Sequence, residues 1–173
     1  MTKLPFDESR PKHGKMVLDE ERILEILRDA HWGTLATVSA DGEPHGVPVG
    51  FAYDEDKGCF YFHTANKGVK IDNIKRDSRV CFSIVGSAEL VTARFAAQYE
   101  SVVIYGNMQK IEDRQEAFDA ALFYCNKFAP KLTAAQDVAD MAVLMEKGFE
   151  YMAMYKLTPT HIGGKCRKVL AKD

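Results

Sequence analysis

The sequence lacks several features that would assign it at once to a familiar class of protein. Its four cysteines, Cys59, Cys81, Cys125 and Cys166, form no C-x-x-C pair, which excludes the usual spacing of a zinc site or a redox dithiol. Three of them lie in apolar runs, as expected of small buried side chains in a reducing compartment. A G-x-G-x-x-G dinucleotide fingerprint is also missing, so any nicotinamide donor is expected to bind transiently.

Charge and hydropathy exclude two further classes. The 23 Lys and Arg residues nearly balance the 25 Asp and Glu residues, and a net charge of −2 supplies no basic field for nucleic acid. No apolar run approaches the length of a membrane span and no signal segment opens the chain, so we expect a cytoplasmic protein that binds neither membrane nor nucleic acid. The five histidines show no metal-ligand spacing, so no metal site is expected.

A length of 173 residues suggests one domain. Residues 1–15 are polar, contain two prolines and are expected to form an arm, so that residues 16–173 make up the single domain. Apolar residues at helical spacing then predict an amphipathic helix, which Asp19 caps at its start and Gly33 closes at its end.

Short strands joined by polar turns dominate the middle of the chain. Strand-like alternation is found over residues 34–39, 45–53, 59–63, 79–85, 101–111 and 151–157. A hairpin turn is predicted at Asp41–Gly42, and the polar segment Gly86–Glu100 is expected to be a long loop. Before the last strand, two helices are predicted to start near Asp113 and Thr133, and a tail is expected from Thr158 onward.

One connection between a strand and a helix could bind an anion. The first N–H groups of a helix are unpaired and lie at the positive end of its dipole, which suits a phosphate. Gly68 lets the backbone approach closely, while Thr64, Lys67 and Lys70 would add donors and positive charge. On the residues alone, a solvated helix start is the alternative. On the residues alone, the pattern around His63, at the end of the preceding strand, favours a hydrogen-bonded structural histidine.

The motifs also occur in a distinctive order. They are Gly33-Thr34-Leu35-Ala36-Thr37, Val47-Pro48-Val49-Gly50-Phe51, Tyr61-Phe62-His63, Gly68-Val69-Lys70 and Arg79-Val80-Cys81-Phe82. This order resembles the pyridoxamine 5'-phosphate oxidase-like FMN split barrels, above all their nitroimidazole-resistance branch, from about Asp19 to Arg167. The resemblance implies a mainly β (α+β) fold, a six-stranded antiparallel split β-barrel with flanking helices. It also implies a homodimer with FMN in grooves between the subunits.

The resemblance further implies which residues contact the cofactor: Pro48, Val49, Gly50, His63, Thr64, Gly68, Lys70 and Ser101. The first three would line the flavin ring with backbone groups, and the next two would lie where the cofactor enters the loop. Gly68 and Lys70 would hold the phosphate, and Ser101 would lie on the strand below the flavin. His63 is also the candidate catalytic residue, which would orient or protonate a reduced acceptor.

The chain departs from the oxidases proper at three places. Those enzymes carry an arginine near the position of Val47, an Arg-Lys pair in place of Val69-Lys70, and an Arg-x-His element near the C-terminus that grips pyridoxal phosphate. Oxidation of pyridoxamine 5'-phosphate is therefore not expected. We hypothesise that Lys67, Lys165 and Arg167, some of them from the other subunit, replace the lost positive charge.

Three functions stay open at this point. The first is an FMN-dependent oxidoreductase that reduces a small acceptor, such as a nitroaromatic or quinone-like compound, with transient NAD(P)H as a possible donor. The second is a haem-binding split barrel in which His63 or His161 is an axial ligand. The third is a non-catalytic flavin-binding module on the same dimer.

Overall fold

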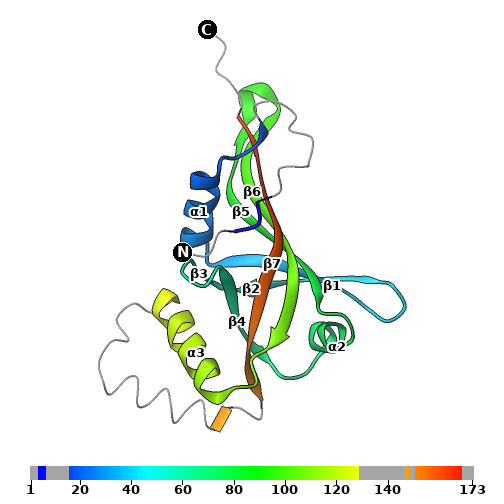
Figure 1. The fold of residues 1–173 in the computed structure, drawn as a ribbon. Helices are drawn as coiled ribbons and strands as arrows, with labels where there is room; N and C mark the ends of the chain where they lie inside the picture. Colours follow the sequence, from blue (N-terminus) through cyan, green and yellow to red (C-terminus); the bar gives the residue numbers. More distant parts are fainter. Residues whose placement is uncertain (1–3, 7–15, 129–146, 149–150, 169–173) are drawn as a thin grey trace.

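A computed structural model describes residues 4–6, 16–128, 147–148 and 151–168. The elements in these residues are α1 (Glu20–Asp29), β1 (Trp32–Val38), β2 (Pro44–Gly50), β3 (Ala52–Asp54), β4 (Cys59–Ala65), α2 (Val69–Arg76), β5 (Arg79–Val91), the short 3-10 turn η2 (Thr92–Arg94), β6 (Ala96–Lys110), α3 (Arg114–Phe128) and β7 (Met152–Arg167). Figure 1 shows the helices placed around one long, curled sheet.

The strands form one antiparallel sheet in the order β2-β1-β5-β6-β7-β4-β3. This confirms the predicted mainly β fold with flanking helices, although the sheet has seven strands where six were expected. The difference arises at Phe51, where the predicted strand 45–53 breaks into β2 and β3, which lie at opposite ends of the strand order. The sheet curls enough for β2 and β4 to approach each other, which places their residues around a common region.

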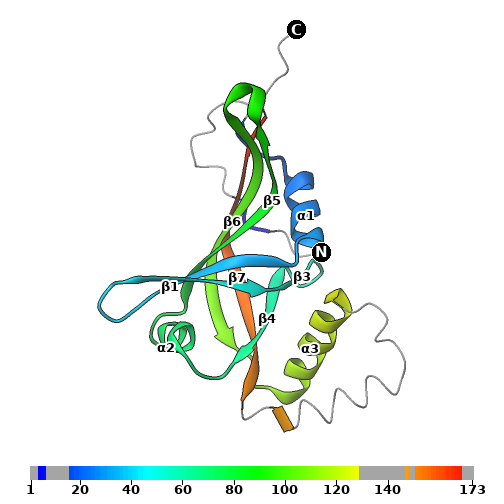
Figure 2. The same ribbon diagram turned by 180° about the vertical axis from the view of Figure 1, so that it is seen from behind.

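The segment Gly86–Glu100, predicted to be a long loop, is mostly strand. β5 and β6 pair from Arg79–Asn107 to Val91–Ala96, and form a ribbon that extends past α1 to one end of the molecule (Figures 1 and 2). Most side chains at the tip of this ribbon are exposed, so the burial alternation that signals a strand is missing. Backbone pairing and side-chain contacts, such as the Gln98 amide that donates to the Glu89 carboxylate at 2.6 Å, join the two strands. Of the predicted tail, Thr158 to Arg167 form the second half of β7.

The core lies between the curled sheet and α1. Its largest members are aromatic, and the Phe51 and Phe62 rings each lie 5.1 Å from the Phe82 ring in edge-on geometry. α1 starts as predicted, because the Asp19 carboxylate accepts a hydrogen bond from the backbone N–H of Arg22 at 2.8 Å. The helix ends at Asp29, before the predicted Gly33, which already lies in β1.

The remaining elements extend this core. α3 starts at the predicted cap, because the N–H of Glu116 donates to the Asp113 carboxylate at 2.8 Å. Within the predicted arm, Leu4 is buried and Phe6 bridges to Ile162 of β7, so this short stretch packs on the sheet. The helix predicted from Thr133 lies outside the described residues. Among the helices in the described ranges, none is long and apolar enough to span a membrane.

Candidate functional site

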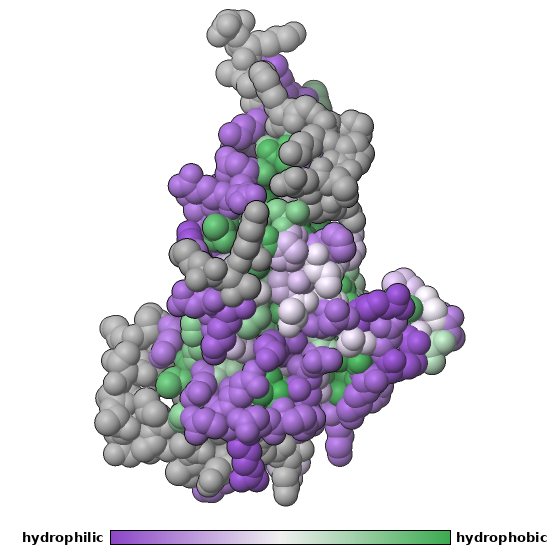
Figure 3. Space-filling model, viewed as in Figure 1, coloured by the Kyte–Doolittle hydropathy of each residue, from purple (hydrophilic) through white to green (hydrophobic). Residues whose placement is uncertain are grey.

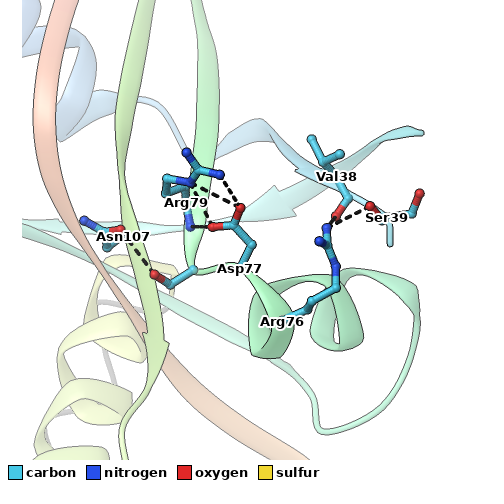
Figure 4. A network of polar contacts seen from close by, with 7 residues as sticks. Val38, Ser39, Arg76, Asp77, Arg79 and Asn107 are labelled. Atoms are coloured by element: carbon cyan, nitrogen blue, oxygen red, sulfur yellow. Dashed lines mark hydrogen bonds and ion pairs between the residues drawn. The ribbon is translucent and has the colours of Figure 1, made fainter. Parts of the chain in front are cut away.

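The candidate cofactor site is built around α2, whose side chains fix it to β1. The Nδ2 group of the buried Asn73 donates to Oγ1 of the buried Thr37 at 3.0 Å. The Arg76 guanidinium donates to the carbonyl of Val38 at 2.6 Å and to that of Ser39 at 2.7 Å, where β1 ends (Figure 4). These contacts set the position of α2 relative to the β1–β2 hairpin.

The C-terminal end of α2 is tied to β5 and β6. The Asp77 carboxylate accepts hydrogen bonds from Arg79, with the shortest at 2.6 Å, and this pairing lowers the pKa of Asp77 to about 2. The Ser78 hydroxyl donates to Oδ1 of Asn107 at 3.2 Å (Figure 4). These contacts fix the end of α2 against β5 and β6.

The start of α2 has the features that an anion site needs. Gly68 has a φ of +116°, a backbone conformation that favours glycine, and no atom lies within 4 Å of the point where a side chain would begin. No side chain caps this helix, and the N–H of Ile71 donates to the Gly68 carbonyl at 2.8 Å, so the N–H groups of Val69 and Lys70 are the ones left to other acceptors. Lys67 is exposed and Lys70 is partly exposed on either side. The residues present therefore fit a phosphate.

Two predicted site residues meet around a residue that the sequence did not single out. A Cβ atom added at Gly50 would lie 2.5 Å from the hydroxyl oxygen of Tyr124 in α3. The centre of the His63 ring lies 6.1 Å from that of the Tyr124 ring. Of the other predicted β2 residues, Pro48 is exposed and Val49 packs partly against the core. The sequence motifs do not indicate Tyr124, because its contacts depend on how α3 packs against the sheet.

The environment of His63 favours a neutral imidazole. Its side chain is exposed to solvent as a whole, yet surrounding protein partly desolvates the ring and lowers the pKa of His63 below its ordinary value. At neutral pH the ring therefore carries no formal charge, and one ring nitrogen can donate a hydrogen bond while the other accepts one. Thr64, the next residue, is half-buried and pairs with Ala153 of β7.

The remaining predicted residues lie apart from α2 within one chain. Ser101 of β6 pairs with Lys165 of β7, and Arg167 pairs with Tyr99. The side chains of Lys165 and Arg167 are exposed. This end of β7 and the helix α2 lie at opposite ends of the molecule (Figure 1), so one chain does not bring Lys165 or Arg167 to Lys70.

One side of the sheet, turned away from the core, carries a set of uncharged residues on β1, β5 and β6. Thr34 of β1 pairs with Ser83 of β5, which pairs with Val103 of β6. The adjacent positions on the same side are Ala36, Cys81 and Tyr105. We call these six residues the uncharged face; all are exposed or partly exposed, while their neighbours along each strand are mostly buried. Figure 3 shows one side of the molecule, where residues of intermediate hydropathy lie near the middle with hydrophilic residues below them; the view does not label the uncharged face.

Solved structures share this fold. A candidate 5-nitroimidazole antibiotic resistance protein from Bacteroides thetaiotaomicron matches with a TM-score of 0.70 and 22% identity, over 87% of this chain and 86% of that one. An FAD and haem binding protein from Mycobacterium smegmatis matches with a TM-score of 0.68 and 16% identity, over 92% of this chain and 77% of that one. At these identities the likeness concerns the fold.

Sequence comparison places the chain in a family. A 5a,11a-dehydrotetracycline/5a,11a-dehydrooxytetracycline reductase of Streptomyces rimosus is 34% identical over 93 residues, which are 53% of this chain and 63% of the relative. The match thus spans less than two thirds of that relative's length. Residues 19–165 match the family described as pyridoxamine 5'-phosphate oxidase, and this chain belongs to that family.

Proposed function

We propose that this protein is an FMN-binding oxidoreductase that reduces a small nitroaromatic or quinone-like acceptor. The observation that carries the proposal is the start of α2, where Gly68 leaves open space between Lys67 and Lys70. A phosphate there would accept from the first-turn N–H groups and from the Lys70 ammonium. Membership of the family, and the same fold in a protein whose description names FAD, support a flavin as the group that carries this phosphate.

The other site residues have roles that fit a flat ring system. When bound, the flavin would supply the redox chemistry between a reduced nicotinamide and the acceptor. β2 is an edge strand of the sheet, so its backbone at Pro48 and Val49 would offer groups to the ring, next to the buried Gly50, which Tyr124 and Phe128 cover. The neutral His63 imidazole would orient the acceptor through a hydrogen bond at neutral pH.

We also infer a homodimer with the cofactor between subunits. The uncharged face offers exposed and partly exposed side chains that a two-fold copy would cover. Light scattering on the purified protein tests this inference: twice the 19.4 kDa chain mass is expected, and a monomer would contradict it.

The comparison with the Streptomyces rimosus reductase supports the choice of acceptor. The name of that relative gives it dehydrotetracyclines as substrates, which favours reduction of a fused-ring carbonyl compound over oxidation of a B6 vitamer. NADPH-dependent reduction of menadione by the flavin-loaded protein is therefore expected. Turnover of pyridoxamine 5'-phosphate without turnover of any quinone or nitroaromatic would contradict the proposal.

The phosphate site can be tested by FMN titration of the flavin-free protein. Lys70→Ala removes a charge-assisted contact to the phosphate, and the affinity for FMN is expected to fall by about tenfold. Lys75→Ala is the matched control, because Lys75 is an exposed lysine in the last turn of the same helix. Equal FMN affinity of the Lys70→Ala variant and the unaltered protein would place the phosphate elsewhere.

Haem binding is the second candidate, favoured by the Mycobacterium smegmatis neighbour whose description names both groups. His63 pairs with Met154 on β7, and roughly 23 Å of strand separates Met154 from His161. The two candidate histidines of one chain would therefore not ligate the same iron. A sharp Soret band in the purified protein would support this function over flavin binding.

A further inference from the structure

Five aromatic rings form a continuous series beside the proposed flavin site. The His63 ring lies 6.1 Å from the Tyr124 ring, which stacks on the Phe128 ring at 4.6 Å. Phe128 in turn meets the His31 ring at 5.3 Å and the Trp32 ring at 6.4 Å, both edge-on. We call these five residues the aromatic row. It links β4, α3 and the start of β1, which lie far apart in the sequence.

The aromatic row differs from the aromatic residues of the core. The core rings, such as Phe51 and Phe82, are fully buried, whereas Trp32 is 63% exposed and His31 and His63 are also exposed. A large aromatic side chain left at the surface beside other rings is characteristic of a surface that binds something flat. The row therefore has ring surface to offer beyond what packing of α3 requires.

A partly buried lysine, Lys127, fixes the row in place. The Lys127 ammonium donates to the Ala30 carbonyl at 2.5 Å and to the Leu27 carbonyl at 3.4 Å, at the end of α1, and it lies 4.3 Å from the centre of the Phe51 ring. This contact holds the last turn of α3 beside the chain segment that leads into β1. The rings on both sides of Lys127 in the sequence are thus positioned by an anchor that is not part of the row.

The glycine at the end of β2 connects the row to the proposed cofactor site. A side chain at Gly50 would begin 2.5 Å from the Tyr124 hydroxyl oxygen and 3.1 Å from the Phe128 ring. The two rings therefore cover Gly50, directly beside Pro48 and Val49, whose backbone we propose to face the flavin. An acceptor stacked on the row would lie next to the redox group.

We propose that the aromatic row is the acceptor-binding surface of this protein, and that it takes a flat molecule of several fused rings, of the quinone class. The inference rests on the proposed function and specifies its substrate class. Three ring-to-ring steps separate His63 from Trp32, so the row is longer than a single six-membered ring and suits a fused system. Electron-rich Tyr and Trp rings stack favourably on an electron-poor quinone. The row carries no carboxylate or ammonium group of its own, in keeping with an uncharged ring system.

The single tryptophan of the chain makes this proposal directly measurable. Trp32 is the only tryptophan, so its fluorescence reports binding at the row without an added label. We would titrate the flavin-free full chain with anthraquinone-2-sulfonate, a three-ring probe, and with 4-nitrobenzoate, a one-ring probe of the same charge. N-acetyltryptophanamide in the same solutions corrects for absorbance and collisional quenching. Saturable quenching by the three-ring probe is expected, with at least about tenfold weaker binding of the one-ring probe.

Variants on one helix separate binding from folding. Phe128→Leu and Tyr124→Leu each remove one ring of the row, and each is expected to weaken anthraquinone-2-sulfonate binding by about tenfold. Phe123→Leu is the matched control, because Phe123 lies on the same helix, is 38% exposed and contacts Tyr61 instead of the row. Its binding is expected to equal that of the unaltered protein. Protection of Trp32 from acrylamide by the three-ring probe needs no variant, and it tests the proposal even if a substitution prevents folding.

The outcomes distinguish this inference from the proposed function. Saturable binding of the three-ring probe by a protein that does not bind FMN would contradict the proposed flavin but support the aromatic row as a binding surface. If the protein binds FMN but the three-ring probe neither quenches Trp32 nor protects it from acrylamide, the proposed role of the aromatic row is wrong and the proposed function is unaffected. Equal affinity for both probes, or equal effects of Phe123→Leu and Phe128→Leu, would also overturn it.

Discussion

Lys127 should make the stability of this protein rise with pH in the alkaline range. Burial lowers the pKa of Lys127 from its ordinary 10.5 to about 8. Between these two values the unfolded chain binds the proton and the folded protein does not, so the free energy of unfolding increases as the pH rises. The increase begins near the folded pKa and ends near the unfolded pKa, and the contribution of this lysine is least favourable below pH 8.

The magnitude follows from the same values. A difference of 10.5 − 8 = 2.5 in pKa corresponds to about 3 kcal/mol in total, and about 2 kcal/mol of this is expected between pH 7.5 and pH 9.5. The two carbonyl acceptors and the Phe51 ring favour the ammonium, so these figures are upper values.

Urea unfolding of the unaltered protein and of Lys127→Met, at pH 7.5, 8.5 and 9.5, isolates this contribution. The methionine does not titrate, so every other pH effect cancels in the difference between the two proteins. Over this range, the free energy of unfolding of the unaltered protein should rise by up to about 2 kcal/mol relative to that of the variant. A difference that stays constant or shrinks as the pH rises would refute the reasoning, and would show that the carbonyls and the ring fully offset burial.

Three further predictions concern packing and titration at single positions. Gly106→Ala should lower the free energy of unfolding by about 3 kcal/mol in a urea or thermal melt, because its methyl group would begin 2.3 Å from a backbone oxygen, whereas Gly163→Ala has open space and should be neutral. Asn73→Ala should cost about 1–3 kcal/mol and weaken FMN binding, since it frees α2 from Thr37; a double-mutant cycle with Thr37→Val should show coupling, and additive effects would contradict the contact. Because burial lowers the pKa of His63, the unaltered protein should lose stability relative to His63→Gln as the pH falls below 6.5, and parallel pH curves would argue against that shift.

Local signals in the sequence predict the elements whose ends depend on neighbouring residues. The start of α1 at Asp19 and the turn at Gly42, where φ is +88°, need only a side-chain acceptor and a residue without a Cβ atom. Burial alternation likewise finds the strands that have one face in the core. It cannot find the tip of the β5–β6 ribbon, because both faces of residues such as Ser87 and Ala88 are exposed there and only backbone pairing defines the strand.

The site is partly predictable for the same reason. The loop from His63 to Lys70 is contiguous in the sequence, so its suitability for a phosphate can be inferred from Gly68 and its flanking lysines. The meeting of Gly50, His63 and Tyr124 depends instead on how α3 packs over the edge of the curled sheet. Periodicity specifies which face of a helix is apolar, but it does not specify which strand that face covers.

The central claim is that the protein holds a flavin, and the most direct test is the absorbance spectrum of the protein purified without added cofactor, followed by chromatography of what heat releases. A flavin spectrum and about one FMN released per chain are expected, or full restoration of that spectrum when FMN is titrated into the flavin-free protein. A Soret band would contradict flavin binding. So would the absence of FMN binding at FMN concentrations high enough to saturate a typical flavoprotein.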